Sequence, residues 1–281
     1  MDNAKRAQVL TEALPYIQEY AGKIVVVKYG GNAMKNPELK KAVMGDIVLL
    51  SMIGVKVVVV HGGGPEISDM LKKTGKQSEF VDGLRVTDDE TMDIDLMVLS
   101  GKVGKDLVSL VQSIGGKAIG ISGVDAGIIE AKILDERLGN VGEITAINTK
   151  PVLDLLDLGY IPIISTIAGD KSGNRYNINA DTAAAQIAGR LGAESMLAMT
   201  DIAGLMEDKD DLSTLIPTVR IEEIPVFIEK GVISGGMIPK VQSCVEAIEH
   251  GVKKVFIIDG RVPHSILIEL LTDEGLGTMF I

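Results

Sequence analysis

The sequence has 281 residues, of which 46% are hydrophobic and 24% charged, and its formal net charge at pH 7 is −11. This composition indicates a folded globular chain whose apolar runs are too short to span a bilayer, so we expect a cytoplasmic protein without a signal peptide. The acidic charge, the lack of Trp and the 3% aromatic content argue against a protein that binds nucleic acid.

The predicted elements begin with a helix over residues 2–21 that lies outside the core sheet and is expected to kink at Pro15. Apolar strands then alternate with helices. We expect strands at 24–28, 57–61, 118–121, 161–165, 195–199 and 255–258, β-like segments near 127–133 and 141–149, and a short terminal strand. We expect helices at 37–53, 65–74, 88–114, 149–158, 180–191, 221–230, 238–250 and 263–271, and a connecting stretch at 82–87. This alternation is typical of parallel strands with helical crossovers, and we expect two lobes that divide near residue 192.

Two of the predicted strands end in glycine-rich turns. The first strand runs into Lys28-Tyr29-Gly30-Gly31 and the second into His61-Gly62-Gly63-Gly64-Pro65. Ligands bind beyond the carboxyl ends of parallel strands, and glycines there let backbone N–H groups approach a phosphate. The chain contains neither the dinucleotide fingerprint nor the P-loop sequence, so a phosphate site here needs another kind of fold. Taken alone, Lys28 fits a solvent-exposed strand end equally well.

Further segments place polar residues where a ligand could bind. Arg85 offers a planar fork that matches a carboxylate, although such a residue alone is more often on the surface. Asn177, Asn179 and Asp181 stand at the start of an alanine-rich helix, where Asn179 is expected to cap and the other two to face the crevice. Glycine-containing turns also occur at 200–205 and at 234–240, where the second opens a helix.

Residue types that often bind metal are few. With only 3 His and 1 Cys, widely spaced, a zinc site is not expected. We favour a hydrogen-bonded structural role for His61 and a buried, inert thiol for Cys244.

Taken in order, these motifs resemble those of the N-acetylglutamate kinases, a branch of the amino acid kinase superfamily. The motifs are KYGG at 28–31, HGGGP at 61–65, GLRVT at 83–87, NINAD at 177–181 and GMIPK at 236–240. The first motif is also expected in carbamate, aspartate and uridylate kinases, so it indicates only the superfamily. The arginine motif together with Asn-x-Asn-Ala-Asp narrows the resemblance to the N-acetylglutamate kinases. The resemblance extends over the chain from end to end. It implies a three-layer αβα sandwich around a mainly parallel central sheet. It divides the chain into an oligomerisation helix (1–22), an N-acetylglutamate-binding and dimerisation lobe (23–192) and a nucleotide-binding lobe (193–281).

The resemblance also assigns roles to residues. It implies that Lys28 and Lys240 are the cations that stabilise the migrating phosphoryl group, and that Asp181 positions them. The residues that would hold N-acetylglutamate are Gly63, Gly64, Arg85 and Asn177. Those on the nucleotide side are Gly30, Gly31, Asp201, Gly204, Gly236 and Met237.

The implied reaction is ATP-dependent phosphorylation of the side-chain carboxylate of N-acetyl-L-glutamate, a step of arginine biosynthesis. A carboxylate with an ordinary pKa of about 4.3 is already an anion at neutral pH, so it needs no general base. The difficulty is the repulsion between two anions, which lysines, backbone amides and Mg²⁺ offset. No carboxylate cluster in the sequence indicates a protein metal site, so we expect Mg²⁺ to be held mainly by the ATP phosphates.

The two ends of the chain resemble the arginine-inhibited branch of the family, in which the N-terminal helix joins dimers into a hexamer, a trimer of dimers. The resemblance implies that L-arginine is an inhibitor. It also suggests a PII-type signalling protein as a partner, but the sequence does not decide whether such a protein binds. The implied arginine site comprises Tyr16, His264, Glu269, Glu274 and Gly275. The alternative is that the helix packs on its own subunit. We predict that deletion of residues 1–20 leaves an active dimer that arginine no longer inhibits.

Other functions stay open at this point. A kinase for an N-acetyl-aminoadipate-type substrate differs by one methylene, which a site discriminates by only about 1–3 kcal/mol. A non-catalytic arginine sensor on the same fold is a second alternative, although the retention of both lysines and Asp181 speaks against it. A nucleotide-binding regulator of nucleic acid conflicts with the net charge of −11.

Overall fold

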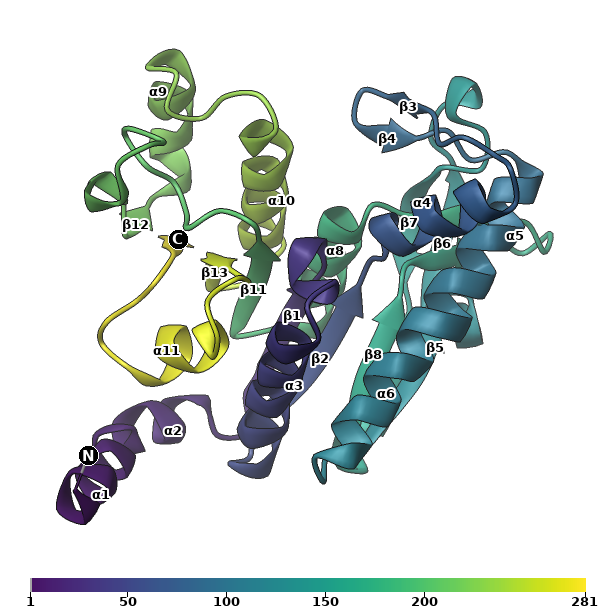
Figure 1. Cartoon of the computed structure of the whole chain (residues 1–281). Coiled ribbons are helices and arrows are strands. Elements are labelled where there is room, and N and C mark those ends of the chain that lie inside the picture. Colours follow the sequence, from purple (N-terminus) through teal and green to yellow (C-terminus); the bar gives the residue numbers. More distant parts are fainter. Residues whose placement is uncertain (1) are drawn as a thin grey trace.

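The computed structural model describes residues 2–281, apart from the side chains of Arg6, Asn32 and Ala33. Its centre is an eight-stranded sheet in the order β12-β14-β13-β11-β1-β2-β8-β5 (Figure 1). Neighbouring strands are parallel except β13 and β14, which pair antiparallel. The strands are β1 (Ile24–Tyr29), β2 (Lys56–His61), β5 (Ala118–Ser122), β8 (Ile161–Ser165), β11 (Ser195–Thr200), β12 (Thr218–Val219), β13 (Lys254–Asp259) and β14 (Thr278–Phe280). The predicted mainly parallel sheet is confirmed.

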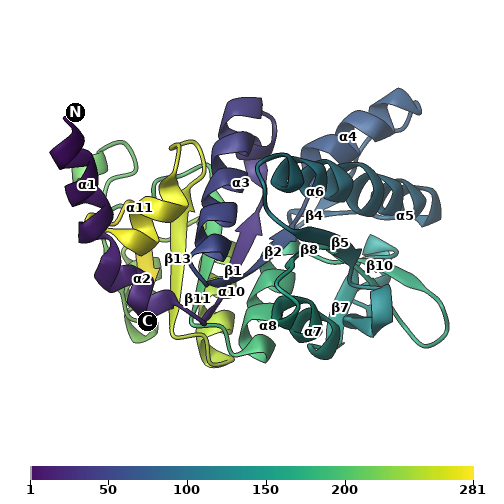
Figure 2. The same ribbon diagram turned by 90° about the horizontal axis from the view of Figure 1, so that it is seen from below.

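Helices cover both faces of this sheet, which is why its central strands are apolar on both sides (Figure 2). On one face lie α3 (Pro37–Met52), α4 (Gly64–Lys73), α5 (Asp89–Leu96), α6 (Gly104–Ser113) and α11 (Ser265–Leu271). On the other lie α7 (Lys150–Asp157), α8 (Ala180–Leu191) and α10 (Met237–Glu249). The arrangement is the three-layer αβα sandwich that the resemblance implied.

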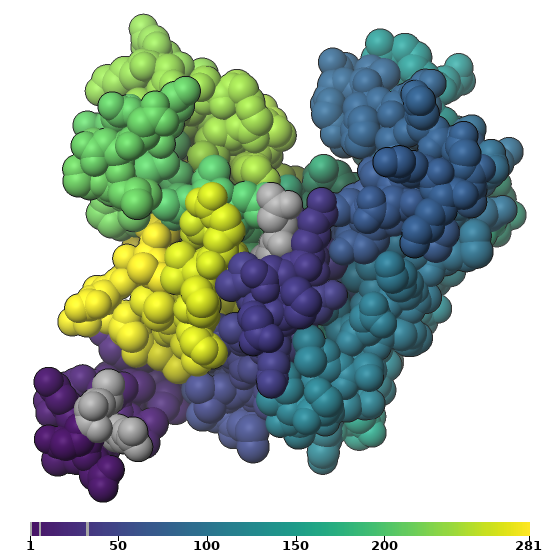
Figure 3. Space-filling view, in the orientation of Figure 1, coloured from purple at the N-terminus to yellow at the C-terminus, as the bar shows by residue number. Residues whose placement is uncertain are grey.

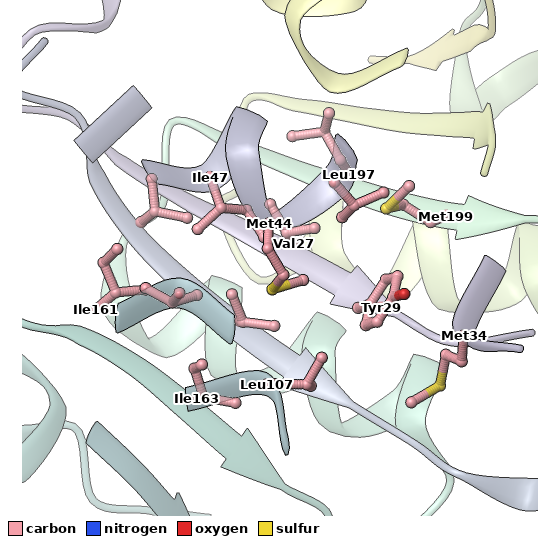
Figure 4. Packing of buried hydrophobic residues seen from close by; sticks show 14 of the residues in the cluster. Val27, Tyr29, Met34, Met44, Ile47, Leu107, Ile161, Ile163, Leu197 and Met199 are labelled. Atoms are coloured by element: carbon pink, nitrogen blue, oxygen red, sulfur yellow. The ribbon is translucent and has the colours of Figure 1, made fainter. Parts of the chain in front are cut away.

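Alternate residues of β1 enter two separate cores. Val27 and Tyr29 pack in the core beneath α3 (Figure 4), whereas Val26 belongs to the core beneath α8. Because side chains alternate along a strand, Lys28 shares the face of Val26 and points toward α8. The register of this one strand therefore directs a lysine toward the start of that helix.

A second sheet of four strands, in the order β10-β9-β6-β7, packs its apolar residues into the core on the α8 side. Its strands are β6 (Ile129–Ile133), β7 (Gly142–Ile147), β9 (Ile167–Gly169) and β10 (Arg175–Asn177). The first two correspond to the predicted β-like segments, and the last two were not predicted. The predicted connecting stretch forms part of a hairpin of β3 (Phe80–Val81) and β4 (Leu84–Arg85). Its two turn residues, Asp82 and Gly83, both have positive φ, which an Asp-Gly pair tolerates.

The N-terminal helix is broken near Pro15 as predicted, into α1 (Asn3–Glu12) and α2 (Leu14–Tyr20). α1 projects from the body of the protein (Figures 1 and 3). α2 instead packs against α11, and its last residue, Tyr20, is buried in the core with its hydroxyl 3.4 Å from Ser195 Oγ. Both helices lie outside the central sheet, as expected, although Tyr20 at the end of α2 is buried.

The long helical region predicted at about 88–114 is helical in the structure and consists of three segments. A π-helical segment, Met97–Val103, separates α5 from α6. The predicted helix at 221–230 likewise consists of a 3-10 turn and α9 (Ile224–Glu229). The 3-10 turns span Gly31–Met34, Asp125–Gly127, Glu136–Leu138, Leu212–Thr214 and Ile221–Glu223. None of the helices within residues 2–281 has the length and apolar character needed to cross a membrane.

Candidate active site

Two lysines from distant parts of the chain meet at one carboxylate. Lys28 Nζ, at the end of β1, lies 2.8 Å from Asp181 Oδ1, in the first turn of α8. Lys240 Nζ, in the first turns of α10, lies 4.0 Å from the second oxygen, Oδ2. The side chain of Lys28 is 9% exposed and that of Lys240 is 33% exposed. The structure therefore brings the three predicted catalytic residues together.

The start of α8 is built to hold this carboxylate in place. Asn179 caps the helix, because its side-chain oxygen accepts hydrogen bonds from the backbone N–H groups of Asp181 and Thr182. Burial alone would raise the pKa of Asp181, but the charges of Lys28 and Lys240 outweigh it and hold the pKa below its ordinary value. Asp181 is therefore an anion at neutral pH, and it pairs closely with Lys28 and at longer range with Lys240.

The second glycine turn, after β2, opens the helix α4. Gly63 is its N-cap, and no side chain caps the helix there. The first backbone N–H groups of a helix lack partners inside the helix, so this end attracts an anion. A methyl group added to Gly63 would lie 2.6 Å from Leu99 Cδ2, and one added to Gly64 would lie 3.9 Å from Arg85 Nη2. The turn is therefore close to both an apolar wall and a guanidinium.

Arg85 is buried at the end of the β3–β4 hairpin. Its guanidinium donates to the hydroxyls of Ser78 and Ser68 and to the carbonyl oxygen of Gly64, and it stacks on Phe80 at 4.8 Å from the ring centre. These contacts fix the plane of the fork. Within the part of the chain that the structure describes, none of the ion pairs formed at 4 Å or less involves Arg85. The fork is therefore oriented, but its charge is available to a carboxylate ligand.

Two adjoining cavities connect these groups. One has a volume of about 210 Å³ and the other about 430 Å³, and four residues line both: Leu84, Val141, Ile178 and Asn179. The larger cavity occupies the hollow between α10 and the β3–β4 hairpin (Figure 3). The smaller is lined, among others, by Gly62, Gly63, Gly64, Arg85, Leu99 and Asn177, and the larger by Asp181, Gly236 and Lys240. All four predicted substrate residues thus line one cavity, beside the predicted catalytic residues.

The residues predicted for the nucleotide side are more dispersed. Gly30 and Gly31 follow β1, where a methyl group added to Gly30 would lie 3.5 Å from Lys28 Nζ and one added to Gly31 would lie 3.0 Å from Asp201 Oδ1. Gly204 lies apart from them, with a positive φ of 155°, and an added methyl group would lie 2.6 Å from Thr278 Oγ1 on β14. Gly236 and Met237 stand at the start of α10, one turn before Lys240.

His61 and Cys244 are placed as the sequence favoured. His61 is fully buried, its Nδ1 lies 2.9 Å from the Gly62 carbonyl oxygen, and burial lowers the pKa of the ring to about 4. It is therefore neutral under physiological conditions. Cys244 is buried on α10, and burial raises the pKa of its thiol, so it is not a reactive nucleophile.

The residues predicted to bind arginine are only partly gathered. Tyr16, Glu269 and Gly275 line a cavity of about 270 Å³ next to α2, and Lys254 of β13 lines it as well. Glu269 already accepts hydrogen bonds from the backbone N–H groups of Leu276 and Gly277. The two other predicted residues, His264 and Glu274, do not line this cavity. His264 Nδ1 instead lies 2.6 Å from Asp46 Oδ1.

Some residues of the site were missed by the sequence analysis. Ser68 and Ser78 hold Arg85, and Leu99 and Thr166 line the smaller cavity. Isolated serines and a leucine in a helix carry no signal of this kind. Phe80 is different, because recognition of Asp82-Gly83 as a hairpin turn would have placed it directly across from Arg85.

Comparison with known proteins extends over nearly the whole chain. The model of the amino acid kinase family matches residues 23–259. An acetylglutamate kinase of Brachyspira hyodysenteriae is 54% identical over 282 aligned residues, which cover 100% of this chain and 98% of that protein.

Solved structures agree with the observed architecture. N-acetylglutamate synthase from Neisseria gonorrhoeae, complexed with coenzyme A and N-acetyl-glutamate, matches with a TM-score of 0.84 and 26% identity. The match covers 98% of this chain and 63% of that one, so this chain spans less than two thirds of the synthase. Carbamate kinase from Giardia lamblia bound to AMP-PNP matches with a TM-score of 0.67 and 16% identity. The match covers 93% of this chain and 99% of that one, and it supports the fold alone.

Proposed function

The chain belongs to the amino acid kinase family, and on that premise we propose that it transfers the γ-phosphoryl group of ATP to the side-chain carboxylate of N-acetyl-L-glutamate. The names of its full-length relatives support this acceptor. Within the structure, the observation that carries the proposal is the placement of Asp181 between Lys28 and Lys240 beside a cavity lined by the guanidinium of Arg85. The reaction is a step of arginine biosynthesis.

The proposed roles of the lysines follow from charge. The acceptor carboxylate and the triphosphate are both anions, and the transferred group gathers further charge on its oxygens in the transition state. Lys28 comes from β1 and Lys240 from α10, and their ammonium groups lie near the two oxygens of Asp181, so together they can neutralise this charge. Asp181 is the positioning residue, because it holds both ammonium groups before the nucleotide arrives.

The proposed orientation of the acceptor follows from the smaller cavity. Arg85 receives the α-carboxylate through its planar fork, and Asn177 faces the same space from β10. The backbone N–H groups at Gly63 and Gly64, at the start of α4, meet the reacting end of the substrate and the phosphoryl group. Binding the two ends of the acceptor in this way brings its side-chain carboxylate toward the two lysines.

Mg²⁺ accompanies ATP in kinases, and when bound it supplies further neutralisation of the phosphate charge. Among residues 2–281, no group of three or more His, Cys, Asp and Glu side chains is placed to hold a metal ion. Asp181 is engaged by two lysines. This donor set fits a metal ion that is held mainly by the ATP phosphates.

The proposal is tested by ADP release with N-acetyl-L-glutamate, L-glutamate and L-aspartate as acceptors. We expect turnover with the acetylated substrate and little with the free amino acids. Lys240→Met should lower kcat by about 10²-fold or more, because a transition-state cation is lost. Lys171→Met is the matched control, because the Lys171 side chain is 89% exposed. Equal rates with L-glutamate, or unchanged turnover of Lys240→Met, would contradict the proposal.

The same assay addresses the two alternatives. A one-methylene-longer acceptor, N-acetyl-L-aminoadipate, should react with a lower kcat/KM, by about 10-fold to 200-fold, if the cavity is matched to glutamate. A chain that binds arginine but releases no ADP with either acceptor would instead be a sensor on the kinase fold.

We also propose that L-arginine inhibits the enzyme from the cavity next to α2. Glu19 and Glu269 line this cavity and their carboxylates suit a guanidinium, which would replace Lys254 as the partner of Glu19 at 2.9 Å. The exposed apolar residues Val9, Leu10 and Leu14 on the N-terminal helices are the proposed contacts of a hexamer built from dimers. Because Tyr20 is buried, a truncation that tests this should end before α2.

The division into lobes is a proposal of the same kind. Residues 23–192 would bind the acceptor and form the dimer, and residues 193–281 would bind the nucleotide. Gly192, the C-cap of α8, has a left-handed backbone conformation with a φ of 62°, and this turn between α8 and β11 supports a boundary there. β11 nevertheless pairs with β1 in one sheet, so the proposed lobes share a continuous core element.

A further inference from the structure

A second buried carboxyl group near the acceptor cavity has no role in the reaction described above. Asp95 lies on α5 and is 0% exposed. Among the described residues, neither of its carboxyl oxygens has a hydrogen-bond partner. A buried carboxylate without partners is costly, so such a group normally has either a proton or a function that depends on its charge.

The position of Asp95 places it behind the acceptor cavity. It precedes Leu99 by four residues, so the two side chains lie on the same helical face, and Leu99 lines the cavity. Helix α5 packs against α4, which starts at the glycine turn, and against β10, which contains Asn177. Asp95 is therefore enclosed by the elements that form the cavity.

The charged group that acts on Asp95 through electrostatic interaction is the guanidinium of Arg85. Burial raises the pKa of Asp95 to about 7, and the positive charge of Arg85 acts in the opposite direction. The influence is mutual: burial lowers the pKa of Arg85 and the charge of Asp95 opposes this effect. The two groups do not form an ion pair at 4 Å or less in the described structure, so their coupling is electrostatic rather than a direct contact.

We propose that Asp95 is a positioning residue for acceptor binding, because its charge sets how strongly the Arg85 guanidinium attracts the α-carboxylate. This inference rests on the proposed function. When Asp95 is neutral, the full charge of Arg85 acts on the substrate. When Asp95 is ionised, it compensates Arg85 and repels the incoming carboxylates, so the acceptor binds more weakly. By linkage, binding of the acceptor then draws a proton onto Asp95.

Other ionisable groups also lie around α5. His61 on β2 is neutral above about pH 4. Asp93 on α5 and Arg175 on β10 form an ion pair at 2.9 Å on the exposed side of the helix. The remaining charged groups on the packed elements are Glu66, Asp69, Lys72 and Lys73 on α4, Lys102 on the π-helical segment, and Asp88, Asp89 and Glu90 at the start of α5.

The test compares the pH dependence of KM for N-acetyl-L-glutamate in the wild type and in Asp95→Asn. In the wild type, KM should rise by about three- to ten-fold between pH 6 and pH 8.5, corresponding to a coupling of about half to one pKa unit. In Asp95→Asn this rise should disappear, with KM close to the low-pH value of the wild type. The effect should fall on KM more than on kcat, because the transfer residues lie elsewhere.

The controls separate charge from packing. Asp93→Asn removes the same charge two residues away, from an exposed ion pair, and should keep the wild-type pH profile. Asp95→Val serves as the second neutral variant if the amide of Asp95→Asn disturbs folding. Calorimetry at pH 7.5 in buffers of different ionisation enthalpy should show proton uptake on acceptor binding in the wild type and none in either neutral variant.

The inference is overturned if Asp95→Asn keeps the wild-type slope of KM against pH, or if it loses kcat without changing KM, as a purely structural residue would. A wild type that does not turn over N-acetyl-L-glutamate at any pH would instead refute the proposed function. The two failures are therefore distinguishable.

Discussion

Replacement of Asp181 by Asn keeps the shape of the side chain and removes the negative charge that Lys28 and Lys240 share. The Lys28 side chain is only 9% exposed, so its ammonium group would be left desolvated and without its 2.8 Å counter-charge. Breaking a buried ion pair typically costs about 3–5 kcal/mol. Because 21% of the Asp181 side chain is exposed, the lower end applies, and we expect a loss of about 3 kcal/mol.

This loss is measurable in the free protein. For a chain of this size it corresponds to a fall in Tm of roughly 5–10 °C. A non-hydrolysable ATP analogue supplies phosphate charge at the same place, so it should raise the Tm of Asp181→Asn by more than it raises that of the wild type. In steady-state assays kcat should fall by about 10²-fold or more, because neither lysine is held in position.

The matched control is Asp154→Asn, which breaks the exposed pair of Lys150 and Asp154 at 2.7 Å on α7. A surface pair of this kind contributes at most about 0.5 kcal/mol, so Tm and kcat should stay at wild-type values. The reasoning would be refuted if Asp181→Asn unfolded at the wild-type temperature and kept its kcat. It would also be refuted if both variants lost the same stability.

Three further predictions concern the acceptor cavity, the buried acid and the N-terminus. Gly63→Ala should raise KM for the acceptor, because the added methyl group would lie 2.6 Å from Leu99 Cδ2. In the control Gly101→Ala the methyl group would meet nothing within 4 Å, so KM should not change. Burial raises the pKa of Asp95 from 3.8 to about 7 in the fold, so the fold loses stability as pH rises through 7. In urea unfolding, Asp95→Asn should be more stable than the wild type by roughly 2–4 kcal/mol at pH 9. At pH 3.5 the two proteins should not differ in this way. Deletion of residues 1–12 removes the exposed apolar residues Val9 and Leu10 and should leave an active dimer, and a hexameric product in sizing assays would contradict this.

Most of the central sheet was predictable because its longer strands are buried, mainly apolar segments, with runs of Val in β1 and β2. Strands such as β1 and β2 are buried on both faces and begin and end within one or two residues of the predicted bounds. The short strands β9, β10 and β12 have no such run, and their pairing depends on neighbours that are distant in sequence. The π-helical segment within 88–114 likewise left no sequence signal, since its residues follow the same helical pattern as the flanking turns.

The candidate site was predictable where a residue type and its position coincide. Glycines after a strand and a lysine at a strand end indicated Lys28 and Gly63, and the topology of a parallel sheet brings such ends together. Asp95 was not predictable, because an aspartate in an acidic helix is usually exposed, and only the fold shows that this one faces inward. His264 was assigned to the arginine site from resemblance, whereas in the structure its ring pairs with Asp46 of α3.

The most direct test of the account is to trap the product of the reaction. An acyl phosphate reacts with hydroxylamine to give a hydroxamate, whereas ADP release alone does not show where the phosphoryl group went. With ATP, Mg²⁺ and N-acetyl-L-glutamate, the wild type should form N-acetylglutamyl hydroxamate, identified by mass, and Lys240→Met should form roughly 10²-fold less. ATP hydrolysis without hydroxamate, or an equal yield from Lys240→Met, would contradict the assignment of Lys28, Lys240 and Asp181 to phosphoryl transfer.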